Sequence, residues 1–150
     1  MELAKILKPL MELEYQMHRL YMWFSDCFGR DPKCRDLFRT LAREELQHRD
    51  TVQRQREMII SNYREYKAVD ADLDGINQLT LILKDIADRR EKMELKKALE
   101  VAIQLEQSAA EHHYRFLLAK ANPILAELVQ RLSDADRIHV QRLIQFNNSL

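Results

Sequence analysis

The amino-acid sequence predicts an all-helical protein folded as a four-helix bundle. Only 2 glycines and 3 prolines occur in 150 residues, too few for the turns of a sheet-rich or loop-rich chain. Apolar residues also recur at alternating steps of four and three, which places them on one face of each helix. A chain of this length can bury a substantial core without disulfides. We therefore predict a single domain over residues 1–150.

Balanced charge argues against several classes of partner. Basic and acidic residues number 24 each, so no net charge attracts nucleic acid or an anionic membrane. The sequence also contains no run of about 18 apolar residues and no signal-peptide core. We predict a cytoplasmic protein that binds neither nucleic acid nor membrane. Cys27 and Cys34 do not form a C-x-x-C motif, and we predict two reduced thiols, with a redox pair as the alternative.

Two helices are predicted in the first half of the chain. The first carries an apolar stripe with a glutamate at its centre: Leu3, Leu7, Leu10, Glu14, Met17, Tyr21, Phe24 and Phe28. Gly29 suits the end of this helix, and Asp31 with Pro32 suits the start of the next. The second helix is expected to extend to about Tyr66. Its stripe also contains polar residues: Cys34, Phe38, Leu41, Glu45, His48 and Val52.

A crossover and two further helices complete the predicted bundle. The polar segment KAVDADLDGINQ leads into a short amphipathic helix with apolar residues at Ile76, Leu79, Leu83 and Ile86. A third stripe reads Leu95, Leu99, Ala102, Glu106, Ala109, His113 and Leu117. Asn122 and Pro123 then signal the start of the last helix. Its stripe reads Leu125, Val129, Leu132, Asp136, His139, Leu143 and Phe146.

The two halves of the chain repeat one pattern. In each half, a helix with a central glutamate precedes a helix that begins at a proline. A carboxylate-x-x-histidine motif follows that proline by 13 residues, from 32 to 45 and from 123 to 136. The members are Glu14, Pro32, Glu45 and His48 in the first half, and Glu106, Pro123, Asp136 and His139 in the second. We therefore predict two similar helical hairpins joined by the crossover.

This repeat predicts a metal centre. Packing the hairpins about a pseudo-twofold axis would bring six ligands to mid-bundle: Glu14, Glu45, His48, Glu106, Asp136 and His139. Residues three apart on a helix can reach one ion from the same face. Four ionised carboxylates in a core would repel one another and lose their hydration, which costs several kcal/mol each unless compensated. Two divalent cations supply that compensation, and this ligand set suits iron or manganese.

At these residues the chain resembles the ferritin-like superfamily, bacterioferritins and rubrerythrins in particular. The likeness is carried by EELQH, LEYQMHRLY and ALEVAIQLEQ and spans nearly the whole chain. It implies a ferritin-like four-helix bundle made of two helical hairpins, with a long crossover containing a short helix. It also implies a di-iron centre, with manganese as the other candidate metal.

The resemblance implies a role for each ligand. Glu45 and Asp136 would bridge the two ions. The remaining ligands pair as follows: Glu14 with His48 on one ion, and Glu106 with His139 on the other. Tyr21 and His113 each follow a ligand glutamate by seven residues. They are expected to be hydrogen-bonded groups around the ions, with His113 as a further candidate ligand.

Three features depart from the family pattern. Asp136 stands where a glutamate is usual, so this ligand is one methylene shorter. Ala109 occupies the place of an additional rubrerythrin carboxylate, and the sequence has no rubredoxin domain with its pairs of cysteines. Leu46 replaces the methionine through which bacterioferritins bind haem. We therefore predict no haem.

The resemblance implies an oxidoreductase that acts on dioxygen or hydrogen peroxide, as a ferroxidase or a rubrerythrin-like peroxidase, with an electron donor that the sequence does not identify. The alternative is an iron-binding, sequestration or delivery protein without substantial turnover. A third reading is a metal-free interaction bundle in which carboxylates and histidines pair with each other. Subunit pairing through helix faces, as a homodimer, is a further expectation from this family.

Overall fold

The computed structural model describes residues 3–61, 72–118 and 123–150, and these ranges contain helices and no strands. The five helices are α1 (Leu3–Cys27), α2 (Pro32–Ser61), α3 (Asp74–Arg89), α4 (Leu95–Leu118) and α5 (Pro123–Asn148). The prediction of an all-helical chain is thereby confirmed for the described residues.

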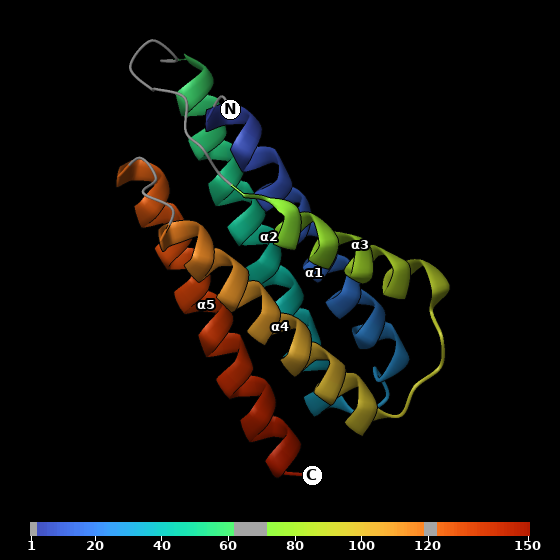
Figure 1. Cartoon of the computed structure of the whole chain (residues 1–150). Coiled ribbons are helices and arrows are strands. Elements are labelled where there is room, and N and C mark those ends of the chain that lie inside the picture. The colour runs from blue at the N-terminus through green and yellow to red at the C-terminus, as the bar shows by residue number, and fades with distance from the viewer. Residues whose placement is uncertain (1–2, 62–71, 119–122) are drawn as a thin grey trace.

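Two pairs of long helices form the body of the bundle (Figure 1). Helix α1 packs along α2, and α4 packs along α5. Helix α3 lies on the outside, where it contacts α1 and α4. The two pairs approach each other less closely than the helices within a pair do, and side chains fill the space between them. This central layer contains the polar groups described below.

The turn between α1 and α2 has the predicted chemistry. The Lys33 backbone N–H donates to the Asp31 carboxylate at 2.9 Å, and the Arg35 N–H donates to the Asp31 carbonyl at 3.0 Å. Pro32 is the first residue of α2, where its missing N–H is not needed. This cap fixes where α2 starts and therefore which of its side chains face α1.

Helix α5 begins at Pro123, as predicted. Asn122 and the expected end of the second helix near Tyr66 lie outside the described residues. Helix α3 runs from Asp74 to Arg89, and the capping residue that follows it, Arg90, has a left-handed backbone with φ 50°. The Arg90 N–H donates to the Ile86 carbonyl at 3.1 Å and so closes the last turn.

The core consists of apolar layers on either side of the polar centre. Near the α1–α2 turn, the rings of Phe24 and Phe38 meet edge to face with centroids 5.4 Å apart. Helix α3 buries Ile76, Leu79 and Leu83 against the bundle. The fully buried aliphatic side chains include Ile6, Leu7, Leu10, Leu13, Leu20 and Leu41. These layers keep bulk water away from the middle of the bundle.

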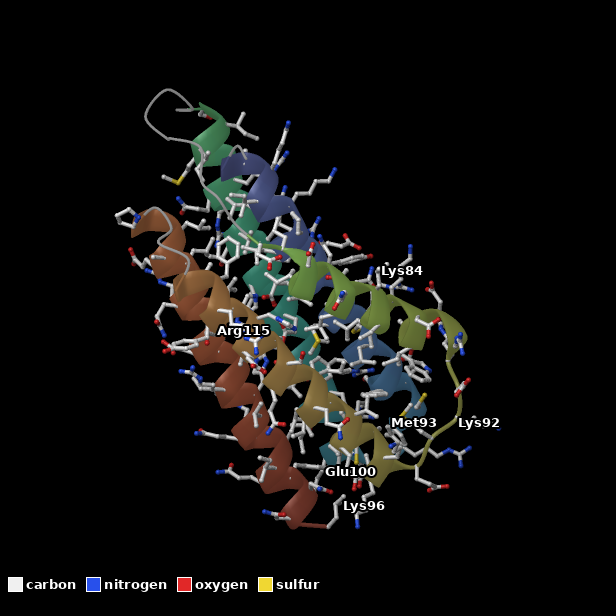
Figure 2. The ribbon with its side chains drawn as sticks, viewed as in Figure 1. Lys84, Lys92, Met93, Lys96, Glu100 and Arg115 are labelled. Atoms are coloured by element: carbon white, nitrogen blue, oxygen red, sulfur yellow. The ribbon has the colours of Figure 1, made fainter. Side chains whose placement is uncertain are left out.

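Charged side chains cover the outside of the helices. Figure 2 shows Lys84 on α3, Lys96 and Glu100 on α4, and Arg115 further along α4, all of them exposed. The described helices include none that combines the length and apolarity needed to cross a membrane.

Candidate metal centre

The six predicted ligands lie together in the central layer, and a seventh residue joins them. All four long helices contribute: α1 supplies Glu14, α2 supplies Glu45 and His48, α4 supplies Glu106 and His113, and α5 supplies Asp136 and His139. The side chain of His48 is 22% exposed, whereas the other six are at most 3% exposed. Their oxygen and nitrogen atoms form three overlapping groups, each able to hold a metal ion.

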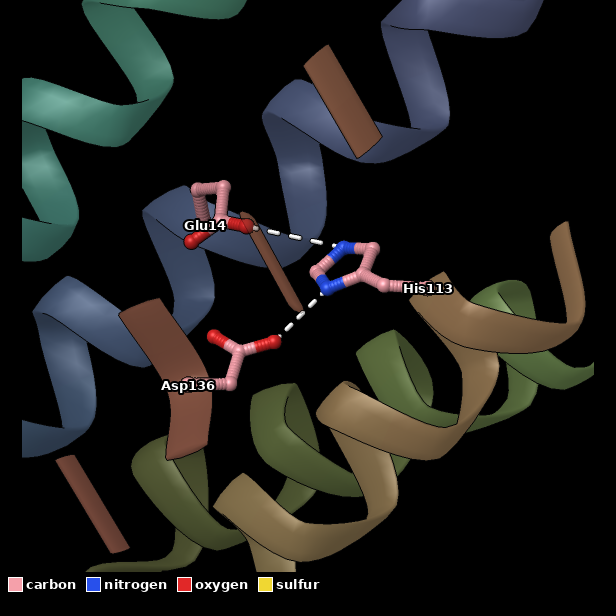
Figure 3. Close-up of side chains that lie close together, drawn as sticks. All are labelled: Glu14, His113 and Asp136. Carbon is pink, nitrogen blue, oxygen red and sulfur yellow. Dashed lines mark hydrogen bonds and ion pairs between the residues drawn. The ribbon is translucent and has the colours of Figure 1, made fainter. Parts of the chain in front are cut away.

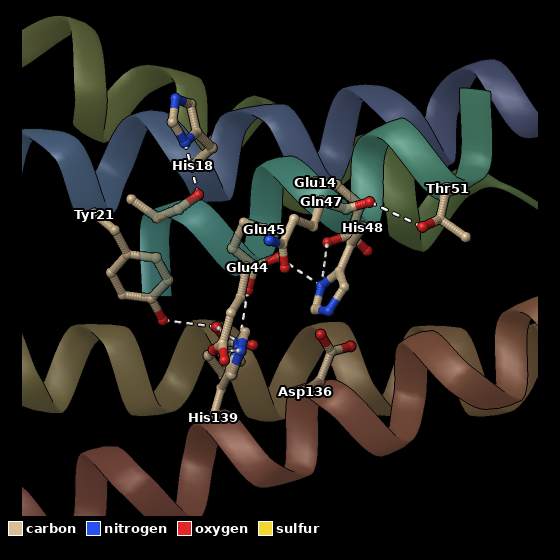
Figure 4. Close-up of polar contacts among 12 residues, drawn as sticks. Glu14, His18, Tyr21, Glu44, Glu45, Gln47, His48, Thr51, Asp136 and His139 are labelled. Carbon is tan, nitrogen blue, oxygen red and sulfur yellow. Dashed lines mark hydrogen bonds and ion pairs between the residues drawn. The ribbon is translucent and has the colours of Figure 1, made fainter. Parts of the chain in front are cut away.

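The first group consists of Glu45, Glu106 and His139. His139 Nδ1 lies 2.8 Å from Glu45 Oε1 and 3.1 Å from Glu106 Oε1. The Tyr21 hydroxyl donates to Glu106 Oε1 at 2.7 Å (Figure 4). Tyr21 is therefore a hydrogen-bonding partner of a candidate ligand, which is the place that the sequence predicts for it.

The second group consists of Glu14, Glu45 and His48. His48 Nδ1 lies 3.4 Å from Glu45 Oε2 and 3.7 Å from Glu14 Oε2. Glu45 thus presents one oxygen to His48 and the other to His139. This is the geometry that a carboxylate shared between two neighbouring ions requires.

The third group consists of Glu14, His113 and Asp136, shown in Figure 3. His113 Nδ1 lies 2.7 Å from Asp136 Oδ2, and His113 Nε2 lies 3.6 Å from Glu14 Oε1. The resemblance implies that Asp136 bridges two ions together with Glu45. Among the described residues, however, the groups that contain Glu45 do not include Asp136, whose hydrogen-bond partner is His113.

Imidazoles and carboxylates therefore alternate in one row through the bundle. Glu14 lies between His113 and His48, and Glu45 lies between His48 and His139. In both glutamates the two carboxylate oxygens face different histidines. Each of the three groups accordingly contains one imidazole and two carboxylates, and the neighbouring groups share a carboxylate.

Glu44 extends this row to the protein surface and was not among the residues predicted from the sequence. Its Oε2 lies 3.0 Å from His139 Nε2 and accepts a hydrogen bond from Arg142. Its side chain is 28% exposed. Burial alone would raise the pKa of Glu44, but the hydrogen bond from Arg142 and the charge of His139 hold that pKa below its usual range. Glu44 is therefore an ionised carboxylate at the outer edge of the centre.

Burial raises the pKa of three inner carboxyl groups. Burial and the nearby charge of Glu45 raise the pKa of Glu14 to about 7. Burial, with the charges of Glu14 and Glu45, raises the pKa of Asp136 well above its ordinary value. Burial also raises the pKa of Glu106, against the opposing hydrogen bond from His139. Without cations, these carboxyl groups are neutralised partly by protons.

Their surroundings raise the pKa of two of the histidines and lower that of the third. Burial alone would lower the pKa of His48 and His139, but hydrogen bonds to glutamates raise these values to about 10 and about 11. Burial lowers the pKa of His113, so its imidazole is neutral at pH 7. In the metal-free protein, two imidazolium groups and the partly protonated Glu14 thus supply part of the compensation that cations would provide.

Three buried polar atoms in this row have no hydrogen-bond partner: Glu14 Oε1, Glu106 Oε2 and His113 Nε2. Each is a lone-pair donor when the two glutamates are ionised and the His113 Nδ1–H donates a hydrogen bond to Asp136 Oδ2. An unpartnered buried polar atom costs roughly 1–3 kcal/mol, and a bound cation would remove that cost. The residues present therefore fit a metal ion both in donor chemistry and in unsatisfied coordination.

Replacing Tyr21 with phenylalanine tests the network in the metal-free protein. The change removes the hydroxyl that donates to buried Glu106 and leaves that carboxyl with one partner fewer. We expect the free energy of unfolding to fall by about 1–3 kcal/mol, measured by urea denaturation in the presence of a chelator. Tyr15→Phe is the matched control, because Tyr15 is 40% exposed. Equal stabilities of the two variants would contradict this role of Tyr21.

The centre as a whole consists of four buried carboxylates, two buried imidazoles and the partly exposed His48, with a tyrosine and a half-buried glutamate around them. Such a set can bind cations, hold protons, or both in competition. Comparison with models of protein families, with curated proteins and with solved structures gives no match to this chain.

Proposed function

We propose that this protein is a non-haem dinuclear metal protein of the ferritin-like kind, with oxidoreductase activity toward dioxygen or hydrogen peroxide. The observation that carries the proposal is the sharing of buried Glu45 between two groups, one with Glu14 and His48, the other with Glu106 and His139. Each group offers one ion an imidazole and two carboxylates. Hard carboxylates with imidazoles are the ligands that iron and manganese take in helical bundles.

In this proposal the chain's residues have distinct tasks. Glu45 would hold both ions at a fixed spacing, because its two oxygens already face the two histidines. Tyr21 would fix the orientation of Glu106 by its hydrogen bond. A small oxidant would approach on the side of His48, and the support for this is that His48 is the most exposed of the seven candidate ligands. The bound metal would supply one-electron redox chemistry that side chains lack.

The ferritin-like arrangement is part of the same proposal. Its support is the pairing of α1 with α2 and of α4 with α5, with α3 between them in the chain and packed on the outside. The repeat places one carboxylate-x-x-histidine motif in each pair, on α2 and on α5. A single polar layer shared by two helix pairs is how such bundles build dinuclear sites.

Iron binding or delivery without substantial turnover is the second candidate function. The observation that favours it is the third group of ligands, which exceeds what a two-ion redox centre needs. Glu44 also connects the buried row to the surface through His139. The two candidates differ in turnover, because a binding protein takes up iron without repeated consumption of oxidant.

An anaerobic Fe(II) titration of metal-stripped protein tests the proposal. We expect tight binding to saturate at about two equivalents per chain, one for each carboxylate-x-x-histidine motif. Admission of dioxygen or hydrogen peroxide should then give repeated oxidant consumption when a reductant is present. A single stoichiometric consumption would favour iron binding or delivery. Binding near zero would leave a metal-free bundle and refute both.

A further inference from the structure

The third group, on the side of the row away from His139, has the same composition as the two groups of the proposed centre. Glu14, His113 and Asp136 come from α1, α4 and α5, and their candidate ligand atoms lie within 4.8 Å of one another. Glu14 Oε2 faces His48, which leaves Oε1 facing His113. Glu14 is shared between two groups, but its oxygen Oε1 is available to the third group alone.

Two of the three unpartnered buried atoms of the row belong to this group. Glu14 Oε1 and His113 Nε2 have no hydrogen-bond partner, face each other across 3.6 Å, and belong to side chains that are 1% and 0% exposed. That separation is too long for a hydrogen bond. A cation between two lone-pair donors would remove the cost of leaving both unsatisfied in the core.

Asp136 prepares His113 to bind a cation. Asp136 Oδ2 lies 2.7 Å from His113 Nδ1. When Asp136 is ionised, it accepts a hydrogen bond from the Nδ1–H, and the other ring nitrogen, Nε2, then carries the lone pair. A carboxylate that holds a histidine in this way is a common partner of metal-bound imidazole. The shorter side chain of Asp136 thus has a task in this group that does not require it to bridge.

We propose that Glu14, His113 and Asp136 form a third cation position, which takes a divalent first-row transition-metal ion beside the dinuclear centre. This inference rests on the proposed centre, because Glu14 is shared with it. Two dications balance the four inner carboxylates, whereas a third adds two charges that no further buried carboxylate among the described residues offsets. The third ion should consequently bind about tenfold or more weakly than the first two.

Equilibrium dialysis against Co(II), with cobalt and protein measured after dialysis, tests this position without any activity assay. Wild-type protein should bind two equivalents tightly and a third at higher Co(II) concentration. His113→Leu removes the imidazole and fills the buried space, so the weak third equivalent should disappear while the two tight ones stay. His112→Leu is the matched control, because His112 lies outside the three groups and faces Gly75.

Each outcome separates this position from the dinuclear centre. Two equivalents in wild type and in His113→Leu would overturn the third position and leave the centre standing. No binding in wild type would overturn both. Three equivalents in His113→Leu, or the loss of a tight equivalent there, would also overturn the proposal. If His113→Leu does not fold by circular dichroism, His113→Phe provides the same test, since it keeps a buried ring but has no lone-pair donor.

Discussion

Replacing Glu45 with alanine is expected to abolish tight binding of both ions of the proposed centre. Glu45 Oε1 faces His139 and Oε2 faces His48, so one substitution removes a ligand from each group at once. It also removes a buried negative charge that both ions share. The loss of affinity should exceed the roughly 10–100-fold that follows removal of an outer-shell partner. An anaerobic Fe(II) titration should show no tight equivalent where wild type shows two.

Glu57→Ala is the control for this experiment, because Glu57 lies on the same helix with an exposed side chain. It should bind metal as wild type does. Glu45→Gln keeps the size of the side chain and covers the case in which the alanine variant fails to fold. Retention of two tight equivalents in a folded Glu45 variant would remove Glu45 from the centre.

Helix starts and buried faces could be predicted because they depend on local chemistry. Asp31 caps α2 and Pro32 begins it, and both follow from residue type alone. With the start of a helix fixed, the 3.6-residue period assigns every later side chain to a face. Glu45 therefore had to lie on the buried face of α2, where the structure places it with 0% exposure.

The neighbours of Asp136 could not be predicted in this way. The repeat treats Asp136 as the equivalent of Glu45, but it does not fix how far α5 is displaced along α4, or how far one helix pair is displaced along the other. His113 follows Glu106 by seven residues and so lies about 10.5 Å further along α4. That displacement brings His113 next to Asp136 and Glu14. Partners between helices depend on this stagger, which no single helix encodes.

Glu44 shows a second limit of reasoning from helix faces. It precedes Glu45 by one residue, which turns it about 100° away from the buried stripe. On periodicity alone such a residue belongs to the solvent. The oxygen Oε2 of its long side chain nevertheless reaches His139 Nε2 at 3.0 Å and accepts a hydrogen bond from Arg142 of α5. Contacts at the edge of a stripe depend on side-chain length and on the facing helix.

The metal-free protein is expected to lose stability as the pH rises from about 7 to about 10. His48 and His139 have pKa values of about 10 and about 11 in the folded protein, against an ordinary value of 6.5. A histidine whose pKa is higher in the folded protein than in the unfolded chain stabilises the fold. This stabilisation is complete when the pH is below the pKa of the unfolded chain, and it is lost as the pH rises through the pKa of the folded protein. The raised pKa of Glu14, about 7, also makes the free energy of unfolding fall as the pH rises, but over a lower pH range that ends near this value.

Urea unfolding at a series of pH values, with a chelator present, measures this dependence. The free energy of unfolding should fall steadily from pH 7 to pH 10 in wild type, and less steeply in His139→Gln, which lacks one of the two titrating imidazoles. A metal-free protein whose stability stays constant or rises over this range would contradict the assignment of charge to His48 and His139.

Metal binding should cancel this dependence, because protons and cations compete for the same carboxylates and imidazoles. An imidazole must be neutral and a carboxyl group ionised before either can coordinate an ion. His48, His139 and Glu14 would therefore release protons when metal binds at pH 7. A rising pH destabilises the metal-free fold and strengthens metal binding, so the stabilisation by metal should grow between pH 7 and pH 9. Protons and metal ions thus compete for the row of carboxylates and imidazoles, and either one stabilises the folded protein when it binds there.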